Sequence, residues 1–127
     1  MPVRILVVDD EPDANDVVST LLGSCGAEVR VAASAAQALE VLAQWKPDVM
    51  VTDIGMPGED GYALLTRLDG QRDELGRIPV IALTAYATTE DRVRLLAAGF
   101  RMHIAKPIEP AELVAGVANV ARTAGKL

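Results

Sequence analysis

Residues 5–12, ILVVDDEP, place four apolar residues directly before two adjacent aspartates, a glutamate and a proline. The apolar run, three of whose members are β-branched, predicts a buried strand, and Pro12 suits the first turn of a following helix. Neighbouring carboxylates repel each other, and burying a carboxylate without a partner is costly. We therefore expect a compensating positive charge near the end of this strand.

Composition limits the classes of protein to which the chain can belong. Its 127 residues, 50% hydrophobic and 24% charged, predict one globular domain over residues 1–122 with a short tail at 123–127. A net charge of −6 weighs against direct nucleic-acid binding, and no apolar run has the length of a membrane span.

The single cysteine, Cys25, excludes an internal disulfide and is compatible with a reducing compartment, so we expect a cytoplasmic location. Because no histidine or basic residue adjoins it in sequence, we expect Cys25 to be a small buried or half-buried apolar residue and not a reactive thiol.

Short β-branched runs alternate with helical patterns along the chain. The expected strands are residues 4–8, 28–32, 48–52, 80–84 and 102–105. The first, third and fourth are nearly continuous apolar runs, as in central parallel strands, whereas the second alternates and suits an edge.

Five segments with an apolar stripe separate or follow these strands. The first should begin at Pro12 and turn these residues to the core: Val17, Val18, Leu21 and Leu22. Ser34 and Gln37 have capping-box spacing at the start of the second, and Gly99 should close the fourth. Five strand–helix repeats predict a doubly wound (βα)5 α/β fold: a five-stranded parallel sheet of flavodoxin-like order 2-1-3-4-5, with helices on both faces.

In such sheets, ligands bind outside the carboxyl ends of the strands. The residues expected at these ends are Asp9, Asp10, Asp53, Thr84 and Lys106. Acids, a hydroxyl and a cation should therefore meet at one edge of the sheet.

Four motifs fall at these strand ends: DDEP, TDIGMPGEDG, LTAYA and AKP. In this order and spacing the chain resembles, over almost its whole length, the CheY-like receiver domain of two-component response regulators. The segments DIGMPGEDGYALL and IALTAYA are most similar in sequence to receivers of hybrid histidine kinases. The resemblance implies a phosphoprotein that takes a phosphoryl group from a histidine kinase or a histidine phosphotransfer domain.

The resemblance also implies a role for individual residues. Asp53 matches the phosphoacceptor, and Lys106 matches the cation that pairs first with this carboxylate and then with the phosphoryl group. Thr84 and the N–H of Ala85 match the groups that bind a phosphoryl oxygen. The Lys106–Pro107 bond is usually cis in the family.

A Mg²⁺ cofactor belongs to the same resemblance. Asp10, Asp53 and the backbone carbonyl of Gly55 match its direct ligands, while Asp9 would act through a bound water. Such a hard cation suits carboxylate oxygens, and phosphoryl transfer needs positive charge around the equatorial oxygens.

The chain departs from the family pattern at His103, where receivers commonly carry tyrosine or phenylalanine as a switch residue with Thr84. His103 is either a rotating, titratable switch or a partly exposed surface histidine.

By resemblance, a downstream protein should bind the fourth helix, fifth strand and fifth helix, and the kinase should bind the first helix and the loop after the fifth strand. Gly55 and Tyr86 stand where family side chains control water access, and they should push the phosphoryl lifetime in opposite directions.

Each motif also has a purely structural explanation that requires no function. The paired aspartates can cap a helix, Asp53 can bond its own turn, Thr84 can pack as a β-branched residue and Lys106 can be a solvated lysine. Two other functions remain as alternatives: a pseudo-receiver that binds partners without phosphorylation, and an aspartyl-phosphate phosphatase of the haloacid-dehalogenase type. The latter usually has a second acid two residues after its nucleophile, where this chain has Gly55. We therefore expect no enzyme beyond self-catalysed phosphorylation and dephosphorylation.

Overall fold

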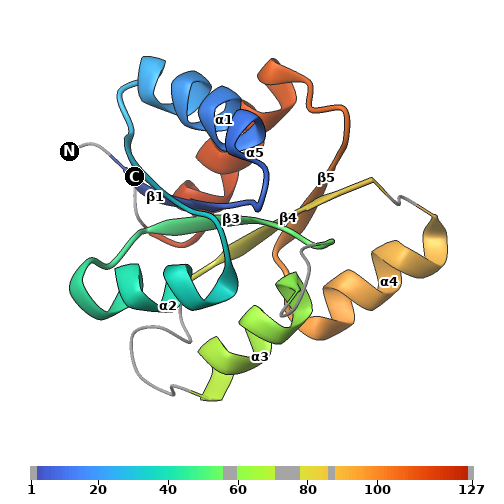
Figure 1. The fold of residues 1–127 in the computed structure, drawn as a ribbon. Helices are drawn as coiled ribbons and strands as arrows, with labels where there is room; N and C mark the ends of the chain where they lie inside the picture. The colour runs from blue at the N-terminus through green and yellow to red at the C-terminus, as the bar shows by residue number, and fades with distance from the viewer. Residues whose placement is uncertain (1–2, 56–59, 71–77, 86–87, 126–127) are drawn as a thin grey trace.

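A parallel sheet with helices on both faces forms the centre of the molecule (Figure 1). The computed structural model describes residues 3–55, 60–70, 78–85 and 88–125. The strands are β1 (Arg4–Val8), β2 (Glu28–Ala32), β3 (Val49–Asp53), β4 (Val80–Thr84) and β5 (Met102–Ala105). Their order is β2-β1-β3-β4-β5, and each neighbouring pair is parallel. The predicted fold and strand order are confirmed.

One strand lies a residue later than predicted. We expected the third strand to end at Thr52, but β3 includes Asp53, which pairs with Leu83 of β4. The acid is therefore held within the sheet and does not begin the following loop.

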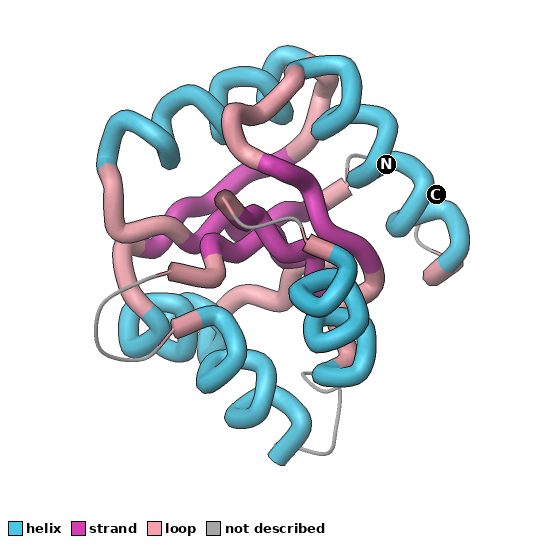
Figure 2. Tube along the Cα trace, turned by 90° about the vertical axis from the view of Figure 1, so that its right-hand side faces the viewer, coloured by secondary structure: helices cyan, strands magenta, loops and turns pink. Residues whose placement is uncertain are grey.

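The helices are α1 (Pro12–Ser24), α2 (Ala35–Gln44), α3 (Gly61–Gly70), α4 (Thr89–Ala98) and α5 (Pro110–Thr123). They flank the strands in both views (Figures 1 and 2). Because α5 includes Thr123, the tail predicted at 123–127 starts one residue too early. No helix in the described parts of the chain has the length and apolar character to cross a membrane.

Alternate residues of each central strand supply two separate cores. Ile5 and Val7 of β1 pack with α1 and α5, whereas Leu6 and Val8 pack with α2, α3 and α4. All four of these side chains are buried. Each such side chain contributes roughly 1.5–3 kcal/mol on burial, which explains why the strand must be apolar throughout.

The predicted helix ends form as expected. The Ser34 hydroxyl accepts a hydrogen bond from the Gln37 N–H at 3.1 Å, and the Gln37 side chain accepts one from the Ala33 N–H at 2.9 Å. Gly99 closes α4 with φ of 109°, in the left-handed region that glycine adopts without strain.

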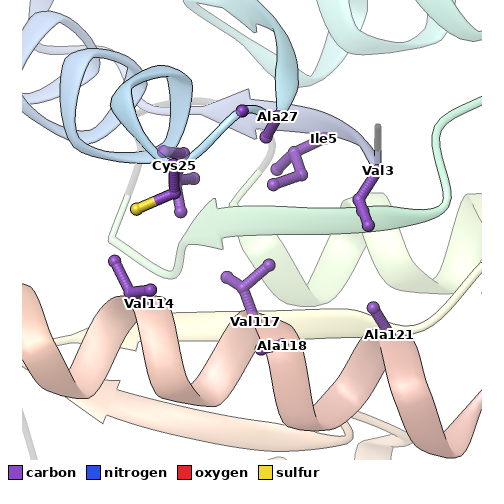
Figure 3. Close-up of a pocket in the computed structure, with 10 residues that line it drawn as sticks. Val3, Ile5, Cys25, Ala27, Val114, Val117, Ala118 and Ala121 are labelled. Carbon is purple, nitrogen blue, oxygen red and sulfur yellow. The ribbon is translucent and has the colours of Figure 1, made fainter. Parts of the chain in front are cut away.

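Two predictions about α1 are wrong. Val17 is 57% exposed because the inward stripe of this helix runs through Asn15, Val18 and Leu22. Cys25 is exposed, since it follows the last turn of α1 at the C-cap. Its side chain borders an apolar cavity of about 580 Å³ between the end of α1, the start of β1 and α5 (Figure 3).

Candidate functional site

Three acids meet where β1 and β3 end. Carboxylate oxygens of Asp9, Asp10 and Asp53 all lie within 4.8 Å of one another. Asp9 and Asp10 follow β1 directly, and Asp53 is the last residue of β3, the neighbouring strand. The predicted convergence of these acids at the carboxyl edge of the sheet is confirmed.

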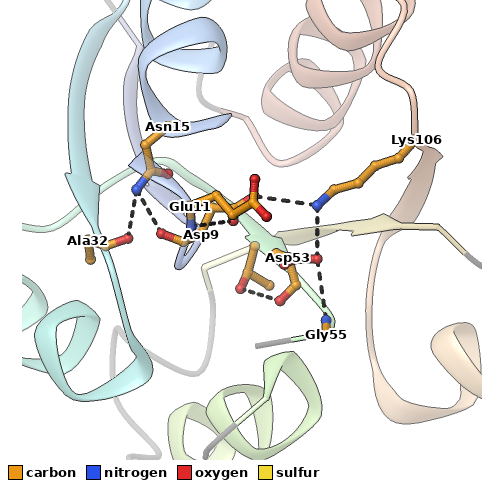
Figure 4. A network of polar contacts seen from close by, with 8 residues as sticks. Asp9, Glu11, Asn15, Ala32, Asp53, Gly55 and Lys106 are labelled. Atoms are coloured by element: carbon orange, nitrogen blue, oxygen red, sulfur yellow. Dashed lines mark hydrogen bonds and ion pairs between the residues drawn. The ribbon is translucent and has the colours of Figure 1, made fainter. Parts of the chain in front are cut away.

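Lys106 supplies the positive charge that the sequence led us to expect. Its Nζ lies 3.2 Å from Oδ1 of Asp53 and 3.5 Å from Oδ2 of Asp9 (Figure 4). The Lys106 backbone N–H donates to the Thr84 carbonyl at 2.8 Å, which continues the pairing of β5 with β4. The Lys106–Pro107 peptide bond is cis, as the resemblance implied.

Backbone N–H groups orient two of the carboxylates. The Glu11 N–H donates to Oδ1 of Asp9 at 3.0 Å, and the Gly55 N–H donates to Oδ1 of Asp53 at 3.3 Å. Asp9 is 1% exposed and Asp53 is 9% exposed, so both acids are taken almost entirely out of bulk water.

Burial and charge act on the two groups that meet across the site. Burial raises the pKa of Asp9, and the hydrogen bond from Glu11 and the charge of Lys106 offset this increase only in part. Burial alone would lower the pKa of Lys106, but the carboxylates of Asp53 and Asp9 outweigh it and raise this pKa overall. Lys106 therefore remains a cation at neutral pH.

The donor set of the acidic cluster fits a hard divalent cation. Three carboxylates face one ammonium group, so negative charge is in excess when all are ionised. The clustered groups offer only oxygen atoms, which Mg²⁺ prefers, and they include both a buried and an exposed acid. A cation that keeps some of its waters could enter from the Asp10 side.

Gly61 and Asn15 are two site residues whose function the sequence did not reveal. A Cβ on Gly61 would lie 2.9 Å from the backbone oxygen of Asp53, so only glycine lets α3 begin this close to β3. Asn15 was not singled out, although an amide in the apolar stripe of α1 was a visible signal.

Of the remaining predicted residues, Thr84, Ala85 and Gly55 lie at or beside the same edge. Thr84 ends β4 and is 3% exposed, and Ala85 follows it. Gly55 is exposed, and among the described residues no heavy atom beyond its chain neighbours lies within 4 Å of the position that a Cβ would take. His103 is half-buried on β5 opposite Ala82, and Tyr86 lies outside the described residues.

Comparisons with known proteins agree with this arrangement. A sequence model of the response regulator receiver domain matches residues 5–118. An uncharacterized 14.6 kDa protein of Leptolyngbya boryana is 43% identical over 110 residues, which are 87% of this chain and 83% of that protein. The phosphate regulon transcriptional regulatory protein PhoB of Pseudomonas aeruginosa is 38% identical over 122 residues, or 95% of this chain.

Solved structures share the fold over almost the whole chain. The receiver domain of the Francisella response regulator 1452 superposes with a TM-score of 0.88 at 30% identity, covering 95% of this chain and 98% of that one. The matched region covers 52% of PhoB, so this chain spans about half the length of that transcriptional regulator.

Proposed function

Since the chain belongs to the response regulator receiver family of two-component signalling, we propose that it is a phosphorylatable switch with Asp53 as phosphoacceptor. One observation carries the proposal: the Asp53 carboxylate lies 3.2 Å from the Lys106 ammonium group and within 4.8 Å of two further carboxylates. A nucleophile, a cation and oxygen ligands for a metal thus occupy one site.

The transfer would proceed from a phosphohistidine of a kinase or phosphotransfer domain. A carboxylate oxygen of Asp53 attacks phosphorus and forms a new O–P bond, while the P–N bond breaks and its electron pair leaves with the imidazole nitrogen. Asp10, Asp53 and the Gly55 carbonyl would hold Mg²⁺, with Asp9 acting through a water. When bound, the ion supplies positive charge that stabilises the developing negative charge on the phosphoryl oxygens.

The other residues at the edge act on the transferred group. The Lys106 ammonium group pairs with Asp53 before transfer and would pair with a phosphoryl oxygen afterwards. Thr84 and the N–H of Ala85, at the end of the adjacent strand β4, would hold a second oxygen. Phosphorylation then favours one of two pre-existing conformations, which alters partner binding.

The direct test is exposure to acetyl phosphate with Mg²⁺, followed by intact mass measurement. We expect one phosphoryl adduct on the wild type and none on Asp53→Asn. Asp48→Asn is a matched control, because Asp48 lies just before β3, at its opposite end, and should leave the adduct unchanged. An adduct on both the wild type and Asp53→Asn would contradict the assignment, and an adduct on neither would favour the pseudo-receiver.

We propose no enzymatic activity towards other substrates. An aspartyl-phosphate phosphatase usually has an acid two residues after its nucleophile, and this chain has the exposed Gly55 there. Wild-type protein should therefore hydrolyse p-nitrophenyl phosphate no faster than Asp53→Asn does.

A surface beside the site suits the kinase or phosphotransfer partner. A groove of about 350 Å³ lies between α1 and the segment after β5, and its lining includes Val17, Lys106 and Ile108. Val17 exposes an apolar side chain there, with the acids Glu11 and Asp13 in the same lining. We propose that this groove receives the partner helix that carries the phosphohistidine.

The output face is proposed to comprise α4, β5 and α5. On α4, Val93 and Leu96 are 61% and 57% exposed, which is typical of an apolar contact surface. His103 lies on β5, so phosphorylation could reach this face through its side chain.

We propose that the domain belongs to a hybrid histidine kinase, on the residues of DIGMPGEDGYALL and IALTAYA, with a freestanding regulator and a transcription factor as the alternatives. We also propose a cytoplasmic location, where the phosphodonor kinases act. An antibody against this domain would separate a freestanding protein from the two larger contexts in the source cells: a band near 13.4 kDa indicates a freestanding protein, and a much larger one indicates a kinase or transcription factor.

A further inference from the structure

Asn15 is a buried amide in the otherwise apolar inward stripe of α1. It is 5% exposed and precedes Val18 and Leu22 on the same side of the helix. Its Nδ2 donates to the Asp9 carbonyl at 2.8 Å and to the Ala32 carbonyl at 3.2 Å (Figure 4). One side chain of α1 thus joins the end of β1 to the end of β2.

Stability alone does not account for an amide at this position. Burying a polar group is costly when its hydrogen bonds are incomplete, and Oδ1 of Asn15 accepts none from the described residues. A leucine would continue the stripe of Val18 and Leu22 without this cost. The hydrogen bonds that the amide donates explain its presence better.

The group that it holds is the peptide unit between the two acids. The Asp9 carbonyl and the Asp10 N–H belong to one rigid plane, so fixing the oxygen also fixes where the Asp10 backbone begins. Asp9 is held on its other side too, because its N–H donates to the Ala32 carbonyl at 3.1 Å. Asn15 and Asp9 therefore both bond Ala32, which ties the acidic turn to the edge strand.

We propose that Asn15 is a positioning residue for the metal site, holding Asp9 and Asp10 against their mutual repulsion in the arrangement that Mg²⁺ binds. This inference rests on the proposed function: Asn15 would act on the metal ligands and not on the metal itself. Without the amide, the peptide between the acids can rotate and the carboxylates can separate. Part of the Mg²⁺ binding free energy must then restore the arrangement, so the affinity of the site for Mg²⁺ falls.

The test is Mg²⁺ affinity measured by calorimetry or NMR titration, with no phosphodonor present. Asn15→Leu removes both donors while filling similar space, and Asn15→Ser is a second, smaller variant should the first fail to fold. We expect the dissociation constant to rise about 10–100-fold, the usual cost of losing a residue that orients metal ligands. Val18→Ala, one turn along the same helix, is the control: it loses stability but should retain wild-type affinity.

A kinetic readout separates positioning from general damage. In Asn15→Leu, the Mg²⁺ concentration that gives half-maximal phosphorylation by acetyl phosphate should rise in the same proportion, while the rate at saturating Mg²⁺ stays within about threefold. Wild-type affinity in both Asn15 variants would overturn the role of Asn15 and leave the proposed function intact. Equal weakening in Val18→Ala would overturn it as well, and a wild-type protein that does not bind Mg²⁺ would overturn the metal site itself.

Discussion

Replacing Gly61 by alanine should destabilise the protein, although glycine-to-alanine changes in helices usually stabilise. Gly61 is the first residue of α3. An added Cβ would lie 2.9 Å from the Asp53 backbone oxygen, 2.9 Å from Cδ1 of Ile54 and 3.2 Å from Cα of Ile54. Two of these three atoms belong to the backbone, so a side-chain rotation cannot relieve the overlap.

The magnitude follows from two opposing effects. Forcing a methyl group into a filled space costs about 1–3 kcal/mol, and the lower entropy of the unfolded alanine chain offsets about 0.4–1 kcal/mol of this. We therefore expect a net loss of about 1–2 kcal/mol in the free energy of unfolding. For a domain of this size the melting temperature should fall by about 3–8 °C.

Urea unfolding of Gly61→Ala and Gly23→Ala would test the reasoning as a matched pair. Gly23 is helical, and in the described part of the chain no heavy atom outside its own helix backbone and chain neighbours lies within 4 Å of the position that its Cβ would take, so Gly23→Ala should stabilise by about 0.5–1 kcal/mol. The relaxation in Gly61→Ala should also displace the Asp53 backbone and slow phosphorylation by acetyl phosphate. Unchanged or increased stability in Gly61→Ala would refute the steric argument, and so would equal losses in the two variants.

Four further outcomes follow from the site. Mg²⁺ at 100 times its dissociation constant should add about 2.7 kcal/mol to the stability of the wild type, and no rise in melting temperature at saturating Mg²⁺ would contradict the metal site. Burial raises the pKa of Asp9 above 3.8, so the folded state binds the carboxyl proton of Asp9 more tightly than the unfolded state does. Ionised Asp9 therefore reduces stability at neutral pH. Without Mg²⁺, Asp9→Asn should thus be more stable than the wild type at pH 7, and the difference should vanish as the pH falls through the raised pKa towards 3.8; a pH-independent difference in urea titrations would exclude this cause. Lys106→Met leaves the acids without their cation and should cost about 1–2 kcal/mol in the absence of Mg²⁺, between the values of exposed and buried pairs, with thermal unfolding as the measurement. His103→Tyr should change phosphorylation-dependent binding of the output partner while phosphate uptake by intact mass stays the same; equal partner affinities in both variants would remove His103 from the switch.

Much of the fold was predictable because its signals are local. Apolar runs marked the strands, and Ser34 and Gly99 marked helix ends through their own backbone and side-chain bonds. Parallel strands bring their carboxyl ends to one edge, so Asp9, Asp10 and Asp53 could be placed together before any distance was known.

The errors arose where a residue's surroundings come from distant segments. Val17 carries the same apolar side chain as Val18, and only the packing of α1 against the sheet and α5 decides which of them is buried. Likewise, Cys25 is apolar in character but follows the last turn of a helix, where its side chain stays exposed at the rim of a cavity.

The kinds of element, their order and the chemical groups at the strand ends could be predicted from the sequence alone, because periodicity and capping act over a few residues. Three contacts follow only from the packing of distant segments: Lys106 pairs with Asp9, 97 positions away, as well as with Asp53; Asn15 ties the doubled aspartate to β2; and Gly61 lies against Asp53. These contacts depend on how far strands and helices approach one another. That approach is set by the packing of both cores at once.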